Sequence, residues 1–120
     1  MKTTQQTTTV QPLQIIDAAR VKQLIDAGGV TVIDVRTKPE IEETGHLKGS
    51  RRIDFRSPDF AETIRSLARN DTYLIYCQSG VRSLRTAQMM EELGFAHVFV
   101  LEGGINTWLH AGLPTLHDQQ

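Results

Sequence analysis

The sequence has a single cysteine, no long apolar run and no excess of either charge, and each of these shortages excludes a class of protein. One cysteine among 120 residues rules out an internal disulfide and argues against a cysteine-based zinc site. No segment reaches the ~18 consecutive apolar residues of a membrane-spanning helix. Thirteen Lys and Arg residues against fourteen Asp and Glu residues give a net charge of −1, so neither nucleic acid nor a membrane is an expected partner. We expect a small folded domain in which the one thiol is either a packing residue or the reactive group.

The chain divides into a polar arm and one domain. Residues 1–11 are mainly Thr and Gln, without the apolar centre of a secretory signal or the arginines of a transit peptide. We predict that residues 1–11 form a disordered or expression-derived arm, that residues 12–117 form a single domain, and that the address is cytoplasmic. The four histidines show no metal-ligand spacing, so we expect no metal site.

Short apolar runs alternate with amphipathic stretches along this domain. The strongest strand candidates are rich in β-branched and aromatic residues and nearly continuous, as in strands that are covered on both faces. They are Thr31–Val35, Thr72–Tyr76 and His97–Leu101, with Leu13–Ile16 and Arg52–Phe55 as weaker candidates. Helical patterns lie between them near residues 18–27, 58–68 (with Ser57 as the cap), 82–93 and 105–111. This alternation predicts an α/β domain with a mostly parallel sheet and helices on both faces, whose chemistry lies at the carboxyl ends of the strands.

The only cysteine, Cys77, stands at such a strand end. After the strand Thr72–Tyr76, the chain continues through Cys77, Gln78, Ser79, Gly80, Val81, Arg82 and Ser83 into a predicted helix. The helix start offers unpaired N–H groups, Gly80 permits a tight turn, and Arg82 adds a positive charge. Helix starts and nearby cations favour the thiolate form of a cysteine, which is the nucleophilic form. Cys77 is therefore the candidate nucleophile, and the residues after it are a candidate anion-binding loop.

Three segments then resemble the rhodanese family of sulfurtransferases, specifically its single-domain members. They are Asp34-Val35-Arg36 with Glu40 and Gly45-His46-Leu47-Lys48-Gly49, then Cys77-x-x-Gly80-x-Arg82-Ser83, then Gly103-Gly104-Ile105 with Trp108 and Ala111-Gly112-Leu113-Pro114. The resemblance spans about residues 13–116 and implies an α/β domain with five largely parallel strands.

The resemblance also implies an enzyme of the thiosulfate sulfurtransferase type with a ping-pong cycle. Cys77 would take the sulfane sulfur of thiosulfate or a thiol persulfide, carry it as a persulfide, and pass it to cyanide, a thiol or a sulfur-accepting protein. No cofactor is implied. Gln78 stands where many thiosulfate-using members have Arg or Lys, which removes one positive charge from the mouth of the loop.

Four further residues, Asp34, Arg36, Glu40 and His46, are expected to support the loop. We expect Arg82 to pair with Glu40 or Asp34 and so to hold the curvature of the loop, rather than to bind substrate. Asp34 and Arg36, at the end of a central strand, are expected to support the loop, with an ordinary surface ion pair as the alternative. The resemblance implies that His46 is structural and bonds to backbone near the site. Arg51 and Arg52 are interpreted as solvated surface, with a docking patch for an acidic partner as the alternative.

Two other functions remain as alternatives. The resemblance to cysteine-dependent phosphatases and arsenate reductases is weaker, because those phosphatases place five residues between Cys and Arg, whereas four separate Cys77 from Arg82. A phosphatase-like enzyme would hydrolyse phosphate esters and bind vanadate. A non-enzymatic rhodanese-like module would bind a partner, or would oxidise at Cys77 without turnover.

Overall fold

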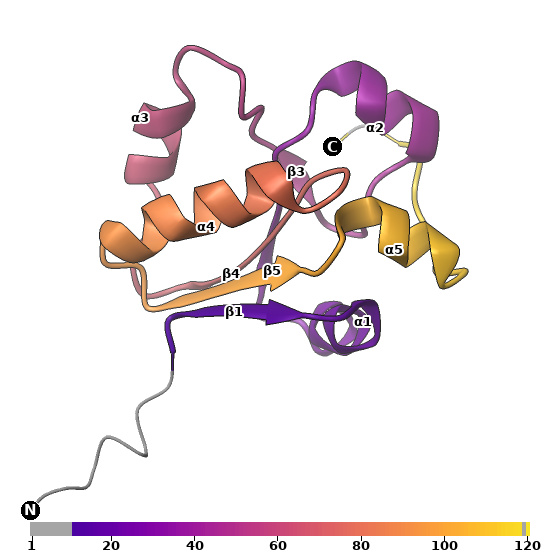
Figure 1. Cartoon of the computed structure of the whole chain (residues 1–120), viewed down its shortest axis with the longest axis horizontal. Helices are drawn as coiled ribbons and strands as arrows, with labels where there is room; N and C mark the ends of the chain where they lie inside the picture. Colours follow the sequence, from indigo (N-terminus) through magenta and orange to yellow (C-terminus); the bar gives the residue numbers. More distant parts are fainter. Residues whose placement is uncertain (1–10, 119) are drawn as a thin grey trace, which may run out of the picture.

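The computed structural model describes residues 11–118 and 120, so of the predicted arm only Gln11 lies within the described residues (Figure 1). Five strands and five helices alternate along the described residues. They are β1 (Leu13–Ile16), α1 (Ala18–Ala27), β2 (Thr31–Asp34), α2 (Lys38–Thr44), β3 (Arg51–Arg52), α3 (Phe60–Arg65), β4 (Thr72–Tyr76), α4 (Val81–Glu92), β5 (His97–Leu101) and α5 (Gly104–His110). Within the described part of the chain, no helix is both long enough and apolar enough to cross a membrane.

All five strands run parallel in the order β1-β5-β4-β2-β3, which confirms the predicted five-stranded α/β fold. β4 is central, with β5 on one side and β2 on the other. The register pairs Asp34 of β2 with Tyr76 of β4, so the residues that follow both strands emerge at the same edge of the sheet. Cys77 and the segment after Asp34 are therefore neighbours, although more than forty residues separate them along the chain.

Two hydrophobic cores fill the space between the sheet and its helices. The side chains of β4 alternate between them: Tyr73 and Ile75 belong to one core, and Leu74 and Tyr76 to the other. Residues of α3 and α4 belong to the first core and residues of α1 and α5 to the second, so these two pairs of helices cover opposite faces of the sheet. Continuing the alternation, Cys77 belongs to the first core, where α4 begins.

Helix α2 was not predicted, because its sequence carries no apolar stripe. Ile41 is its only buried residue. The helix is defined instead by its start, where Thr37 and Glu40 form a capping box and a proline stands in the first turn. The T-x-x-E spacing was the signal for this helix.

Two predicted elements differ from the structure by more than one residue. The predicted strand Arg52–Phe55 is only Arg51–Arg52, because the chain turns at Asp54, whose carboxylate accepts a hydrogen bond from the Arg56 N–H. The helix predicted to be capped by Ser57 and to run to residue 68 is shorter, Phe60–Arg65. The Ser57 hydroxyl donates to Asp59 rather than capping the helix, and residues 57–60 form a turn before it starts.

Candidate active site

The Cys77 side chain is buried and surrounded by hydrogen-bond donors. We call residues 77–83, which join β4 to α4, the Cys77 loop. The backbone N–H groups of Gly80 and Ser83 donate to the Cys77 sulfur at N···S distances of 3.1 and 3.4 Å. The Ser83 hydroxyl lies 3.3 Å from the same sulfur. Three polar groups thus converge on one atom, and amide donors in this arrangement stabilise an anion.

Gly80 is the residue that turns these amides inward. It precedes the first residue of α4 with a φ of 104°, in the left-handed region that favours glycine. Its backbone also lies against Gly103, since a Cβ built on Gly80 would stand 3.4 Å from the Gly103 nitrogen. Gly80 is therefore required by the turn, whereas a Cβ there would make only an ordinary contact with the chain before α5.

The side chain of Arg82 points away from the loop and pairs with Glu40 of α2. Its two terminal nitrogens donate to the two carboxylate oxygens of Glu40 at 2.9 and 2.6 Å. The carboxylate of Glu40 also accepts from the Thr37 N–H, at 2.9 Å. A bidentate pair of this kind fixes orientation as well as charge. Of the two carboxylates considered from the sequence, the structure joins Arg82 to Glu40.

The Glu40–Arg82 pair predicts a stability that depends on pH. The hydrogen bond from Arg82, with those of Thr37, holds the pKa of Glu40 at about 2 instead of the usual 4.5. Because the pKa of Glu40 is lower in the folded state, its ionised carboxylate stabilises the fold in full above pH 4.5. This stabilisation is lost as the pH falls toward 2. We expect Glu40→Gln to lower the free energy of unfolding at neutral pH by about 1–3 kcal/mol, and the difference from the parent to narrow in acid.

Urea unfolding at several pH values measures this difference. The matched control is Glu42→Gln on the same helix, since Glu42 is exposed and makes no ion pair among the described residues. A gap between Glu40→Gln and the parent that stays constant down to acid pH would contradict the prediction.

Asp34 and Arg36 form a second, fully buried ion pair at the end of β2. Two Arg36 nitrogens, Nε and Nη2, donate to the two Asp34 oxygens at 2.9 and 2.8 Å. Other Arg36 donors reach the Thr44 hydroxyl, the Gly45 carbonyl and the Gln78 side-chain oxygen. Burial lowers the pKa of Arg36, but its hydrogen bond and charge interaction with Asp34 outweigh burial and raise it. This pair is therefore not an ordinary surface ion pair, and it contacts the loop through Gln78.

Helix α5 forms backbone hydrogen bonds with the start of the Cys77 loop. The Ile105 N–H donates to the Cys77 carbonyl at 2.9 Å, and the Asn106 N–H donates to the Gln78 carbonyl at 3.2 Å. Gly104 makes this approach possible, because a Cβ there would stand 2.5 Å from both of those carbonyl oxygens. The Gly103-Gly104 pair was noticed in the sequence, but its contact with the loop was not foreseen, and Asn106 was missed.

His46 is buried and lies outside the Cys77 loop. Its Nδ1 lies 2.9 Å from the Leu47 carbonyl and 3.1 Å from the Ser50 hydroxyl, and its Nε2 lies 2.6 Å from the Asp118 carboxylate. None of its hydrogen bonds within the described residues reaches the Cys77 loop. His46 therefore ties the end of the chain to the segment before β3 and is not placed to exchange protons with Cys77.

This geometry suits a cysteine nucleophile with an anionic product on its sulfur. Among residues 11–118 and 120, no three His, Cys, Asp or Glu side chains are grouped to hold a metal ion. Both guanidinium groups that contact the Cys77 loop are paired with carboxylates, so the donors left for the sulfur are the amides and the Ser83 hydroxyl.

Known proteins resemble this chain in sequence and in fold. A profile of the family described as "Rhodanese-like domain" matches residues 17–111. Thiosulfate sulfurtransferase 16, chloroplastic, of Arabidopsis thaliana is 32% identical over 97 residues, covering 72% of this chain and 80% of that protein. Thiosulfate sulfurtransferase GlpE of Stutzerimonas stutzeri is 32% identical, covering 77% of this chain and 83% of its own. The crystal structure of a rhodanese-related protein from Thermoplasma volcanium is 30% identical with a TM-score of 0.75, covering 88% of this chain and 99% of that one.

Proposed function

The chain belongs to the rhodanese-like domain family, with sulfurtransferases among its relatives, and we propose that it transfers a sulfane sulfur through a persulfide on Cys77. The observation that carries the proposal is that two N–H groups, of Gly80 and Ser83, donate to one sulfur, with the Ser83 hydroxyl 3.3 Å from it. These amides point at the Cys77 Sγ and stabilise the negative charge of its thiolate, the form that attacks the sulfur donor, without reorganisation.

In the first half of the cycle, the Cys77 thiolate attacks the outer sulfur of the donor. With thiosulfate, a new S–S bond forms to Cys77, the original S–S bond breaks, and its electron pair leaves with sulfite. The total charge is unchanged, since thiolate and thiosulfate become persulfide and sulfite. Gly80 and Ser83 are the residues proposed to stabilise the negative charge on the loop side of the reaction.

In the second half, a nucleophile attacks the outer sulfur of the Cys77 persulfide. Cyanide leaves as thiocyanate, and a thiolate leaves as a persulfide of its own, so in both cases the Cys77 thiolate is restored. No oxidant or reductant is consumed, because the sulfur moves between nucleophiles. Arg82 and Glu40 are proposed to keep the loop in shape through both halves, and Asp34 and Arg36 to support it through Gln78.

The mass of the intact protein tests this proposal. After mixing with thiosulfate or glutathione persulfide and removal of the donor, we expect the protein to gain the mass of one sulfur atom on Cys77. Cyanide is then expected to remove that mass in a single step. A protein that stays unmodified with every sulfane donor would contradict the proposal, as would a sulfenate on Cys77 without turnover.

Gln78 is proposed to determine how well the loop accepts a dianionic donor. Its side-chain oxygen accepts from Arg36 at 3.2 Å, and its side-chain nitrogen donates to Asn106 at 2.8 Å. The entrance of the Cys77 loop therefore has an uncharged amide that two hydrogen bonds hold in place. We expect Gln78→Arg to raise kcat/KM for thiosulfate about tenfold at low ionic strength, and the gain to shrink with added salt.

The matched control is Gln78→Met, which removes the same two hydrogen bonds without adding charge. Steady-state rates with thiosulfate and with a thiol persulfide separate the two effects. Equal gains in Gln78→Arg and Gln78→Met, or a gain that is independent of salt, would show that charge at position 78 does not govern donor choice.

The proposed reactants are a small sulfane donor and a thiol, cyanide or sulfur-accepting protein. The proposed compartment is the cytoplasm, where a reducing environment keeps a single thiol free of disulfide partners. The proposed domain bounds are residues 12–117.

A further inference from the structure

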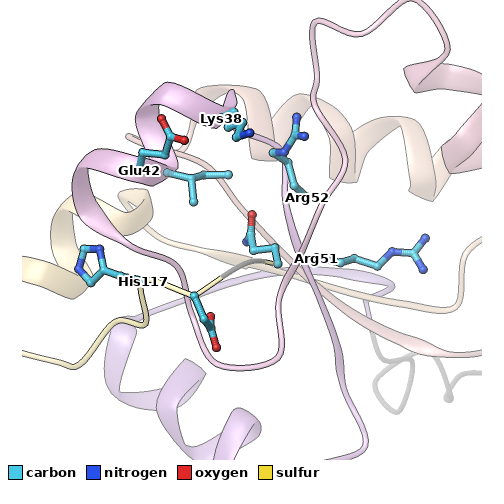
Figure 2. Close-up of a pocket in the computed structure, with 8 residues that line it drawn as sticks. Lys38, Glu42, Arg51, Arg52 and His117 are labelled. Carbon is cyan, nitrogen blue, oxygen red and sulfur yellow. The ribbon is translucent and has the colours of Figure 1, made fainter.

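A cleft of about 440 Å³ lies outside the Cys77 loop, between α2, β3 and the chain around Asp118. We call it the α2–β3 cleft. The buried side chain of Ile41 forms part of its lining, and Lys38, Arg51 and Arg52 bring three positive charges to it. In Figure 2, Lys38 and Arg52 extend toward the same rim, whereas Arg51 extends in another direction. Lys38 and Arg52 thus form the positive rim of the cleft, whereas the Arg51 guanidinium is directed away from that rim.

These cations are not neutralised within the protein. Among the described residues, no ion pair or side-chain hydrogen bond engages Lys38 or Arg51, and Arg52 has only Asp54, at 4.0 Å. The two arginines at the Cys77 loop differ, since Arg36 and Arg82 are each paired with a carboxylate below 3 Å. The positive charge that is free to bind a ligand therefore lies in the α2–β3 cleft and not in the loop.

The local charge contrasts with that of the whole chain. The lining of the cleft has three basic and two acidic side chains, and the segment 48–56 that contributes Arg51 and Arg52 has four basic residues against one acidic residue, while the whole chain has a net charge of −1. Such a patch attracts an acidic partner. The lining has no Phe, Tyr or Trp side chain, so it offers little stacking surface for nucleic-acid bases. Glu42 and Asp118 also line the cleft, so the positive charge available to an acidic ligand is that of Lys38 and Arg52 at the rim. An acidic polypeptide fits these features best.

Helix α2 separates the cleft from the Cys77 loop. Glu40 faces the loop and binds Arg82, whereas Lys38 and Ile41 of the same helix line the cleft. A helix with its side chains is about 10–12 Å across. An extended chain spans that distance with roughly three or four residues. A polypeptide bound in the cleft can therefore present a cysteine to the loop.

We propose that the α2–β3 cleft binds an acidic segment of the protein that accepts sulfur from Cys77. The identity of the partner as an acceptor rests on the proposed function, whereas its acidic chemistry rests on the cleft itself. Arg51 and Arg52 are exposed, as expected of solvated surface, and this proposal takes up the docking alternative for them.

Binding is measured first, without sulfur chemistry. The probe is a fluorescein-labelled peptide of alternating Glu and Ser, and its anisotropy is followed with the full chain carrying Cys77→Ser. We expect binding at low salt, none for the same peptide with Gln in place of Glu, and at least a tenfold loss of affinity in Arg51→Glu/Arg52→Glu. The control is Arg20→Glu/Arg85→Glu, which changes net charge equally at two exposed arginines outside the cleft and should bind nearly as the parent does.

An equal loss in both double variants would overturn the proposal, because binding would then follow net charge alone. So would tighter binding of a labelled single-stranded RNA that depends on Arg51 and Arg52, since the partner would then be a nucleic acid. Circular dichroism is expected to show that all variants are folded, as the four substituted side chains are exposed.

Transfer is measured second, with acceptor peptides that carry one cysteine about four residues from the Glu run. The persulfidated protein is expected to pass sulfur to this peptide at least fivefold faster than to its Gln counterpart, and Arg51→Glu/Arg52→Glu is expected to remove the preference while leaving transfer to cyanide intact. If no persulfide forms, the proposed function fails while the binding result still stands. If a persulfide forms and the peptides react equally, only the docking proposal fails.

Discussion

Cys77→Ser is expected to reduce sulfur transfer from thiosulfate to cyanide to the uncatalysed background, a loss of about 10⁴-fold or more. The hydroxyl is not a nucleophile toward sulfane sulfur at neutral pH, and it cannot hold a persulfide. The Gly80 and Ser83 amides would remain directed at position 77, so the loss would come from the reacting atom and not from the loop. Thiocyanate formation is the measurement.

Ser83→Ala is the matched control for this result. It removes the hydroxyl 3.3 Å from the Cys77 sulfur but keeps the Ser83 N–H that also points at it. We expect a reduced rate that is still far above background, about 10-fold below the parent, as for the loss of one hydrogen bond to a charged group. Thiocyanate formation that survives in Cys77→Ser would show that the sulfur passes through no covalent intermediate on this residue.

Gly104→Ala is expected to have the second largest effect, because two penalties act at one position. Gly104 has a φ of 67°, which is strained for any residue with a Cβ, and the new atom would stand 2.5 Å from the carbonyl oxygens of Cys77 and Gln78. Neither carbonyl can move aside, since each accepts a hydrogen bond from α5. We expect a loss of about 2–4 kcal/mol in unfolding free energy. Any folded fraction is expected to form the Cys77 persulfide at least a hundredfold more slowly.

Gly112→Ala separates the two penalties. Gly112 has a similar φ of 75°, but a Cβ added there would meet nothing within 4 Å, so this substitution costs only the backbone strain of about 1–2 kcal/mol. Urea unfolding and the rate of persulfide formation are compared for both variants. If the two alanines cost the same stability and the persulfide forms at the parent rate in each, α5 does not position the loop.

Elements with a strong local pattern could be predicted from the sequence. α1 ends at Gly28 as expected, and β4 and β5 have the predicted bounds, because buried apolar runs and glycine stops are signals carried by neighbouring residues. α2 escaped prediction because one buried residue makes no periodic pattern. The ends of α3 and β3 were misplaced because local side-chain hydrogen bonds at Ser57 and Asp54, rather than propensity, decide where those elements start and stop.

In the candidate site, too, local features could be predicted from the sequence and contacts between distant residues could not. That Cys77 ends a buried strand, with a glycine turn and a helix behind it, is contained in seven consecutive residues and could be read from them. The Glu40 partner of Arg82 lies 42 positions away, and two carboxylates remained possible until the structure showed that Asp34 is paired with Arg36 and that α2 brings Glu40 to the loop.

By itself, the sequence determined the fold class and the place of the thiol, because periodicity and turn chemistry act between near neighbours. Only the tertiary structure decided which α5 amides hold the loop carbonyls, and that Lys38 and Arg52 share a cleft. Those contacts join segments that are distant along the chain, and the order of strands in the sheet and the packing of helices on its faces choose among the pairings that the residues alone allow.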